Sequence, residues 1–175
     1  MYTEDDGCGK SLDEGQIVGG KEAKIGELPF MALLGYRVKR QIIYQCGGTL
    51  INRYAVSSIM FSLSILTEKH ETFRRYVISA AHCQSPQSPI VEVMLGQTNL
   101  EEDPECEGCA HAQKFRIRYS DVITHEEWDI SKIVDEGNDI ILIRLPKLAM
   151  TDREDEKYRV RPVCLAYNNQ IQYVY

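Results

Sequence analysis

The sequence predicts an all-β domain built from short strands. From residue 17 onward, short apolar runs alternate with turn signals, a pattern typical of a β-sandwich or a β-barrel. Long amphipathic helical patterns are missing, with one exception at residues 54–74. The chain has 175 residues, 43% hydrophobic and 26% charged, which is the length and composition of one soluble globular domain.

Six segments have the apolar content and the flanking turns expected of strands. They are residues 29–35, 42–50, 75–79, 91–95, 114–123 and 140–145. Glycine pairs at 19–20 and 47–48 mark places where the backbone must bend or pack closely. Residues 1–16 are polar, acidic and glycine-containing, which indicates a flexible leader.

The charge balance argues against a nucleic-acid partner. The formal net charge is -6, and the Lys and Arg residues are scattered rather than arranged along one face. Affinity for nucleic acid rests largely on such residues neutralising phosphates, so we expect no nucleic-acid partner. No apolar run approaches the roughly 18 to 20 residues of a transmembrane helix, so no membrane partner is expected either.

The six cysteines, an even number, fit a secreted disulfide framework, although six cysteines permit about 15 pairings. Cys106 and Cys109 form a C-x-x-C, which elsewhere is redox-active or binds metal. Neither a βαβ setting nor a second pair of metal ligands accompanies it, so a structural bridge in a surface loop is favoured. The first ten residues are acidic and polar, unlike a signal peptide, so a signal for secretion would lie outside this sequence.

Residues 77–83, Val-Ile-Ser-Ala-Ala-His-Cys, are the stretch with the strongest functional pattern. Small residues beside His82 let another segment approach its ring, and a disulfide at Cys83 would fix the backbone that carries it. Taken alone, the stretch fits a core histidine equally well. Three further segments accompany it in order: 17–20 (Ile-Val-Gly-Gly), 46–52 (Cys-Gly-Gly-Thr-Leu-Ile-Asn) and 137–145 (Gly-Asn-Asp-Ile-Ile-Leu-Ile-Arg-Leu).

In this order the four segments resemble the N-terminal half of a chymotrypsin/trypsin-like serine protease. The resemblance covers about residues 17 to 170. It implies a Greek-key β-barrel, the first of the two barrels of that fold, with the second barrel missing. It implies neither a cofactor nor a metal. Calcium-binding members often carry a glutamate where this sequence has Gln97, which removes a charged ligand.

The resemblance assigns His82 as the general base and Asp139 as the carboxylate that orients it. Asp139 precedes a buried apolar run, where a carboxylate is costly unless it is hydrogen-bonded, so a histidine partner is physically reasonable. Without His82, Asp139 would be interpreted as a turn residue before a strand. The other histidines are weaker candidates, and His125 is interpreted as structural because it precedes an aromatic residue as in the family.

The serine nucleophile is absent from the sequence. In the family it lies in a Gly-Asp-Ser-Gly-Gly motif of the second barrel, and these 175 residues contain no such motif. Ser79 and Ser120 lack the glycine-rich turn that supplies the oxyanion-hole amides. The chain as written is therefore expected to be catalytically inactive.

Residues 17–20 resemble the new N-terminus of an activated zymogen. The activation cleavage would fall between Gln16 and Ile17, where a trypsin-like activator prefers Arg or Lys before the cleaved bond. Activation by the usual route is therefore not expected.

The leader around Cys8 and the two-cysteine loop resemble clip-domain serine proteases of arthropod immune and developmental cascades. This resemblance implies three disulfides: Cys8–Cys164, Cys46–Cys83 and Cys106–Cys109. Residues 1–16 would be a linker to an absent upstream domain, and residues 17–175 a partial peptidase domain.

Residues 54–74 interrupt the family pattern. Deleting these 21 residues leaves Cys-Gly-Gly-Thr-Leu-Ile-Asn-Arg-Arg-Tyr-Val-Ile-Ser-Ala-Ala-His-Cys, the uninterrupted sequence pattern. Our hypothesis is a retained in-frame intron or a gene-model error. The alternative is an exposed insertion of this particular protein.

The predicted function is that of a secreted serine endopeptidase in an extracellular cascade, acting on protein substrates or on cascade proteases. One alternative is a non-catalytic homologue that serves as a secreted binding module or cascade cofactor. Another is a product without function, which poor folding would favour because a lone barrel exposes the apolar face that its partner covers. The sequence beyond Tyr175 would discriminate between an enzyme and a homologue.

Overall fold

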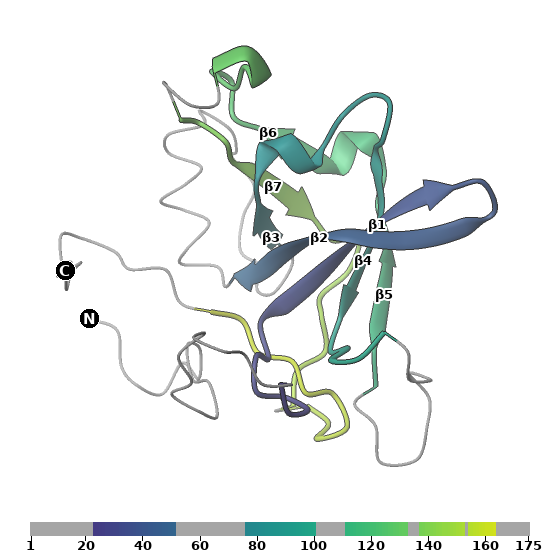
Figure 1. Cartoon of the computed structure of the whole chain (residues 1–175). Helices are drawn as coiled ribbons and strands as arrows, with labels where there is room; N and C mark the ends of the chain where they lie inside the picture. The colour runs from purple at the N-terminus through teal and green to yellow at the C-terminus, as the bar shows by residue number, and fades with distance from the viewer. Residues whose placement is uncertain (1–22, 52–75, 101–110, 133–136, 153, 164–175) are drawn as a thin grey trace, which may run out of the picture.

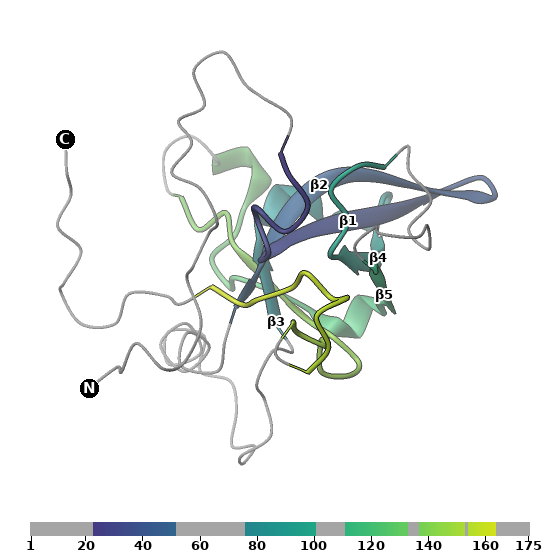
Figure 2. The ribbon, with the colours of Figure 1, turned by 90° about the horizontal axis from the view of Figure 1, so that it is seen from below.

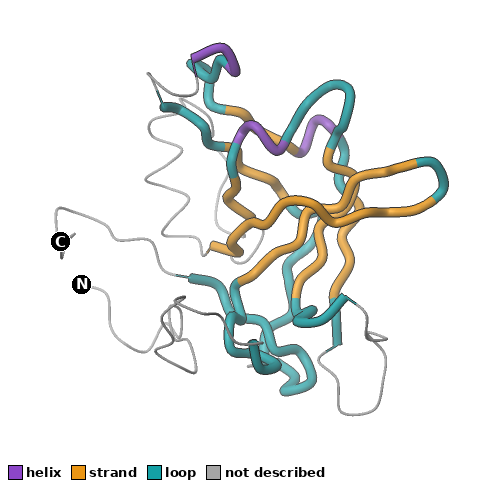
Figure 3. The backbone as a smooth tube through the Cα atoms, in the orientation of Figure 1, coloured by secondary structure: helices purple, strands orange, loops and turns teal. Residues whose placement is uncertain are grey.

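The computed structural model describes residues 23–51, 76–100, 111–132, 137–152 and 154–163. In this part every regular element is a strand or a single turn of 3-10 helix (Figure 3). The strands are β1 (Met31–Val38), β2 (Gln41–Ile51), β3 (Tyr76–Ser79), β4 (Ile90–Leu95), β5 (Gln113–Arg116), β6 (Val122–Thr124) and β7 (Ile141–Arg144). The 3-10 turns are η2 (Ala81–Cys83), η3 (Tyr119–Asp121) and η4 (Ile130–Lys132). The all-β prediction is confirmed.

The strands form one seven-stranded antiparallel sheet in the order β5-β4-β1-β2-β3-β7-β6 (Figure 1). The first four strands lie in the spatial order β4-β1-β2-β3, in which the fourth strand returns beside the first, and this is the Greek-key arrangement. The topology that the resemblance implied is therefore present.

The sheet must curl, because its two edge strands are consecutive in the chain. β5 and β6 are joined by residues 117–121 alone. In a flat sheet of seven strands the edges would lie about 29 Å apart, whereas this connection reaches about 21 Å at most. The edges therefore approach each other, and the sheet adopts the rounded shape of a barrel wall (Figure 2).

Side chains of the central strands alternate between two apolar clusters. On β3, Val77 belongs to the main core, whereas Tyr76 packs in a smaller cluster. On β7, Ile143 and Leu142 divide in the same way. The main core also contains Ala32, Leu34, Leu50, Ile90, Val93, Leu95, Phe115 and Ile141, all 1% exposed or less.

The predicted strand at residues 114–123 is wrong in one respect, because it consists of two strands separated by η3. The Arg118 N–H donates to the Asp121 carboxylate over 3.2 Å, and the Asp121 N–H donates to the Arg118 carbonyl over 2.9 Å. These two bonds close a turn, which lets β5 pair with β4 at one edge and β6 pair with β7 at the other.

The glycine pair at 47–48 behaves as predicted at one of its positions. A Cβ on Gly48 would lie 2.6 Å from Val77 Cγ1 and 3.0 Å from the Ile78 carbonyl oxygen, so only glycine lets β3 approach β2 here. At Gly47 the nearest atom would be 3.6 Å away, an ordinary contact. Across the described ranges, no helix combines the length and hydropathy that a membrane span requires.

Candidate active site

The pairing of β3 with β7 brings His82 and Asp139 together. In this antiparallel pair Ser79, the last residue of β3, lies opposite Ile141, the first residue of β7. His82 follows Ser79 by three residues, and Asp139 precedes Ile141 by two. Both residues therefore emerge at the same end of the strand pair, although 57 positions separate them in the chain.

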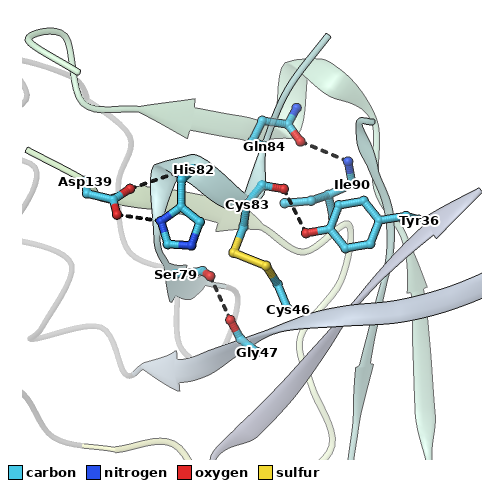
Figure 4. Close-up of a disulfide and its surroundings, with 9 residues drawn as sticks. All are labelled: Tyr36, Cys46, Gly47, Ser79, His82, Cys83, Gln84, Ile90 and Asp139. Carbon is cyan, nitrogen blue, oxygen red and sulfur yellow. Dashed lines mark hydrogen bonds and ion pairs between the residues drawn. A yellow bond between two sulfur atoms is a disulfide. The ribbon is translucent and has the colours of Figure 1, made fainter. Parts of the chain in front are cut away.

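Asp139 holds His82 through both of its carboxylate oxygens (Figure 4). One oxygen accepts the backbone N–H of His82 over 2.8 Å, and the other lies 2.6 Å from the imidazole Nδ1. Because an ionised carboxylate only accepts hydrogen bonds, Nδ1 carries the proton. The lone pair of the neutral ring is then on Nε2, which is the atom a general base needs to present.

The surroundings keep Asp139 ionised. Desolvation raises the pKa of Asp139, but hydrogen bonds from His82, the charge of His82 and the N–H of Ala81 together outweigh it, so the pKa is lowered. The Asp139 side chain is 25% exposed and the His82 side chain 50%. His82 is therefore held by a shielded carboxylate while its ring remains open to solvent.

A left-handed turn directs Asp139 toward His82. Gly137 has φ 69° and Asn138 has φ 61°, a conformation that glycine adopts freely and asparagine tolerates better than most residues. The side-chain amide of Asn138 also donates to the Glu127 carboxylate over 3.4 Å. Gly137 and Asn138 are therefore residue types suited to the left-handed turn that precedes Asp139.

His82 lies in η2, which is attached to the sheet on two sides (Figure 4). The disulfide between Cys46 and Cys83 links η2 to β2, with a Cα–Cα distance of 6.2 Å. This is the pairing that the resemblance implied. The Tyr36 hydroxyl donates to the Cys83 carbonyl over 2.8 Å, and burial raises the pKa of Tyr36, so the hydroxyl stays protonated as a donor.

Sequence reasoning missed Tyr36 as part of this site. Its position is 47 residues from Cys83, and an aromatic residue within an apolar run gives no local signal of such a contact. The contact arises from the folding of the sheet, in which β1 pairs with both β2 and β4.

The other candidate residues in the described part of the chain do not join the pair. The Ser79 hydroxyl donates to the Gly47 carbonyl over 2.7 Å, so it is engaged with β2. His125 Nδ1 accepts the Glu127 N–H over 3.2 Å, and the ring of His111 makes an edge contact with Tyr158. Within the described ranges, His82 Nε2 makes no hydrogen bond, and no group of three acidic, histidine or cysteine side chains is placed to hold a metal.

An open cavity of about 750 Å³ lies beside the pair. Gln84 and Asn138 form the side next to His82 and Asp139, and Trp128 supplies an aromatic wall. The remaining lining is Pro86, Glu126, Glu127, Asp129 and Ile130. The cavity is therefore bordered by close chain neighbours of His82 and Asp139, although the two side chains themselves do not line it.

Several residues of the sequence interpretation lie outside the described part of the chain. They are the leader 1–16, the Gln16–Ile17 bond, residues 54–74, His70, and Cys8, Cys106, Cys109 and Cys164.

Comparison with known proteins identifies relatives of this arrangement. A family model described as Trypsin matches residues 72–173. The chain is 30% identical over 171 residues to the CLIP domain-containing serine protease HP8 of Bombyx mori, covering 94% of this chain and 39% of that protein. It is 29% identical over 168 residues to phenoloxidase-activating enzyme 1 of Spodoptera litura, covering 92% of this chain and 38% of that protein.

The fold is shared with a solved structure of the same group. The Grass clip serine protease of the Drosophila Toll pathway superposes with a TM-score of 0.60 at 26% identity, covering 90% of this chain and 38% of that one. The chain thus spans about two fifths of the length of these relatives. Because the Trypsin model matches more than half of its 175 residues, the chain belongs to the trypsin family.

Proposed function

We propose that this chain supplies the general base and the orienting carboxylate of a serine endopeptidase. The bidentate contact between Asp139 and His82 carries the proposal, because it fixes both the tautomer and the direction of the imidazole. His82 Nε2 would take the proton from a serine hydroxyl, and Asp139 would stabilise the imidazolium that forms.

The second half of the catalytic centre is not encoded in these 175 residues. A Gly-Asp-Ser-Gly-Gly motif is absent from the sequence, and no serine hydroxyl contacts His82 within the described ranges. We propose that residues 17–175 are a partial peptidase domain preceded by a leader, and that residues 1–175 alone do not hydrolyse peptides.

The relatives suggest the setting of the activity. Their names place them among clip-domain serine proteases and phenoloxidase-activating enzymes. We propose protein substrates of a secreted proteolytic cascade for this chain as well. The Cys46–Cys83 disulfide supports secretion, because disulfides persist in oxidising compartments.

The role of the pair can be tested in the chain as it stands. We expect nitrogen-15 NMR of His82 at neutral pH to show a proton on Nδ1 and a free lone pair on Nε2. Asp139→Asn should abolish the preference for a proton on Nδ1, because an amide side chain can donate a hydrogen bond to Nδ1 as well as accept one from it. Asp121→Asn is the matched control, since Asp121 pairs with Arg144 and not with His82. A proton on Nε2 in the unaltered chain would contradict the assignment.

The enzymatic part of the proposal is tested on the native transcript. If it continues into a Gly-Asp-Ser-Gly-Gly segment, the longer protein should hydrolyse peptides, and His82→Ala should lower kcat by about 10⁶-fold, as loss of the histidine does in a Ser-His-Asp triad. A segment with the serine replaced would favour the non-catalytic homologue. The 175-residue chain itself should not react with a fluorophosphonate probe, and labelling that depends on His82 would refute its predicted inactivity.

A further inference from the structure

The structure gathers exposed basic side chains on the outer face of β1 and β5, which flank β4, and at the tip of the β1–β2 hairpin. The hairpin projects from the sheet in both views of the ribbon (Figures 1 and 2). We call this surface the basic face, and its exposed cationic residues are Arg37, Lys39, Arg40, Lys114 and Arg116.

Strand register places these residues on one side of the sheet. Gly35 lies opposite Tyr44 on β2 and opposite Glu92 on β4, and Glu92 in turn lies opposite Arg116 on β5. The Tyr44 hydroxyl reaches across Gly35 to the Glu92 carboxylate over 2.5 Å, so these side chains share the outer face.

Positions two residues apart on a strand share a face, so Arg37 joins Gly35 and Lys114 joins Arg116. The intervening residue Phe115 is buried in the core, which confirms the alternation. Lys39 and Arg40 connect the paired ends of β1 and β2, and therefore form the hairpin tip.

Among the residues that the structure describes, none neutralises the positive charge of the basic face through an ion pair with any of its five cationic side chains. Residues 31–51, which span β1 and β2, contain no Asp or Glu. The carboxylate of Glu92 is engaged by Tyr44, whose pKa is raised by desolvation and by that hydrogen bond. The described residues of this face thus carry a local excess of cations, in a chain whose net charge is -6.

Apolar side chains accompany the cations at the hairpin. Ile42 lies directly opposite Arg37 and packs against Gly35 beside Tyr44, so it belongs to the basic face, whereas Val38 and Ile43, which are 42% and 39% exposed, lie on the other side of the hairpin. Arginine mixed with apolar side chains is the composition of a protein interface.

From the charge, the register and the apolar neighbours together, we propose that the basic face binds an acidic segment of a protein partner. Complementary charge would accelerate the encounter and make the affinity depend on ionic strength, because the cations are exposed to solvent. The inference goes beyond the proposed peptidase function, since it needs neither His82 nor a serine.

The test is fluorescence anisotropy of the full 175-residue chain with a fluorescein-labelled oligo-glutamate peptide. We expect saturable binding at low ionic strength that weakens as salt is added. The double variant Lys39→Gln/Lys114→Gln should raise Kd by about tenfold, because each exposed ion pair contributes a few-fold to affinity. Lys24→Gln/Lys147→Gln is the matched control, since it removes the same charge from exposed positions outside the basic face and should change Kd by less than about twofold.

Three outcomes would overturn the proposal. One is the absence of binding at low ionic strength. A second is an equal loss of affinity in both double variants, which would reduce the effect to net charge. The third is tighter binding of a single-stranded oligonucleotide of the same charge as the peptide, which would assign the face to nucleic acid. Far-UV circular dichroism of each variant ensures that the comparison is made between folded proteins.

Discussion

Two regions of the same sheet hold their functional side chains in different ways. One is the β3–β7 junction, where η2 places His82 beside Asp139, and the other is the basic face. The junction is fixed by the Cys46–Cys83 disulfide, by the Tyr36 hydroxyl and by the close approach of β3 to Gly48. The basic side chains are exposed and free of ion pairs within the described ranges. A proton transfer requires atoms placed to within a fraction of an ångström, whereas attraction between charges tolerates movement of several ångströms.

This difference predicts that substitutions at the junction lower the free energy of unfolding. Substitutions on the basic face should instead weaken binding of the acidic peptide and leave the free energy of unfolding nearly unchanged. Surface substitutions away from packed or hydrogen-bonded groups usually change the free energy of unfolding by less than about 0.5 kcal/mol. Lys39→Gln/Lys114→Gln therefore serves as the common reference for the following predictions.

The largest effect is expected from removing the disulfide. Cys46 and Cys83 are 37 positions apart, and a loop of that length corresponds to about 4 kcal/mol of stabilisation through the unfolded chain. Cys46→Ala/Cys83→Ala should lower the free energy of unfolding in urea by about that amount. A loss no larger than that of the Lys39→Gln/Lys114→Gln reference would show that the bridge does not secure the junction.

The next largest effect concerns the connection from β2 to β3. Ile51 lies directly opposite Tyr76, so the 24 residues 52–75 begin and end at neighbouring positions. Deleting residues 54–74 leaves three residues, a length that hairpin loops commonly have. The shorter loop should stabilise the domain by about 2 kcal/mol, measured by urea denaturation.

The opposite result would change the interpretation of residues 54–74. If the deletion destabilises the protein, the segment contributes to the fold, and the hypothesis of a retained intron or gene-model error is wrong. An unchanged His82 NMR spectrum in the deletion variant would show in addition that the segment does not position the imidazole.

A smaller effect is expected from Tyr36→Phe. The variant keeps the buried ring and removes the hydroxyl that donates to the Cys83 carbonyl, which should cost about 1 kcal/mol. It should also broaden or shift the His82 imidazole resonances, because η2 loses one of its two attachments. Tyr158→Phe, at an aromatic residue beside His111 and away from η2, is the control that should leave the His82 resonances unchanged.

The smallest effect is the pH dependence contributed by Asp139. Because its pKa is lowered in the folded state, its stabilisation is complete above the pKa of an unfolded aspartate, about 4, and is lost as the pH falls through the lower folded value. Asp139→Asn should therefore destabilise the protein more at about pH 6 than at about pH 3. Equal destabilisation at both values would show that the carboxylate charge does not contribute.

Much of the site could be predicted from sequence because its residues lie in short contiguous patterns. His82 and Cys83 are adjacent, and Asp139 directly precedes an apolar run that leads into β7. The strands were predicted to within a few residues, apart from the break between β5 and β6, which depends on which neighbours these strands pair with. The role of Tyr36 had no local signal, since it depends on a hydroxyl reaching a carbonyl 47 residues away.

The sequence by itself determined the all-β class, because apolar periodicity is a local property of the chain. Its short motifs carried the resemblance, and the resemblance implied the Greek key and the pairing of His82 with Asp139. The tertiary structure alone decided the tautomer of His82 and the attachment of η2. It also corrected the expectation that Lys and Arg are scattered, since Arg37 and Arg116 reach one face only when β1, β4 and β5 pair in register. Strand register depends on residues that are far apart in the chain, so a cluster of charges that it brings together cannot be recognised from the sequence alone.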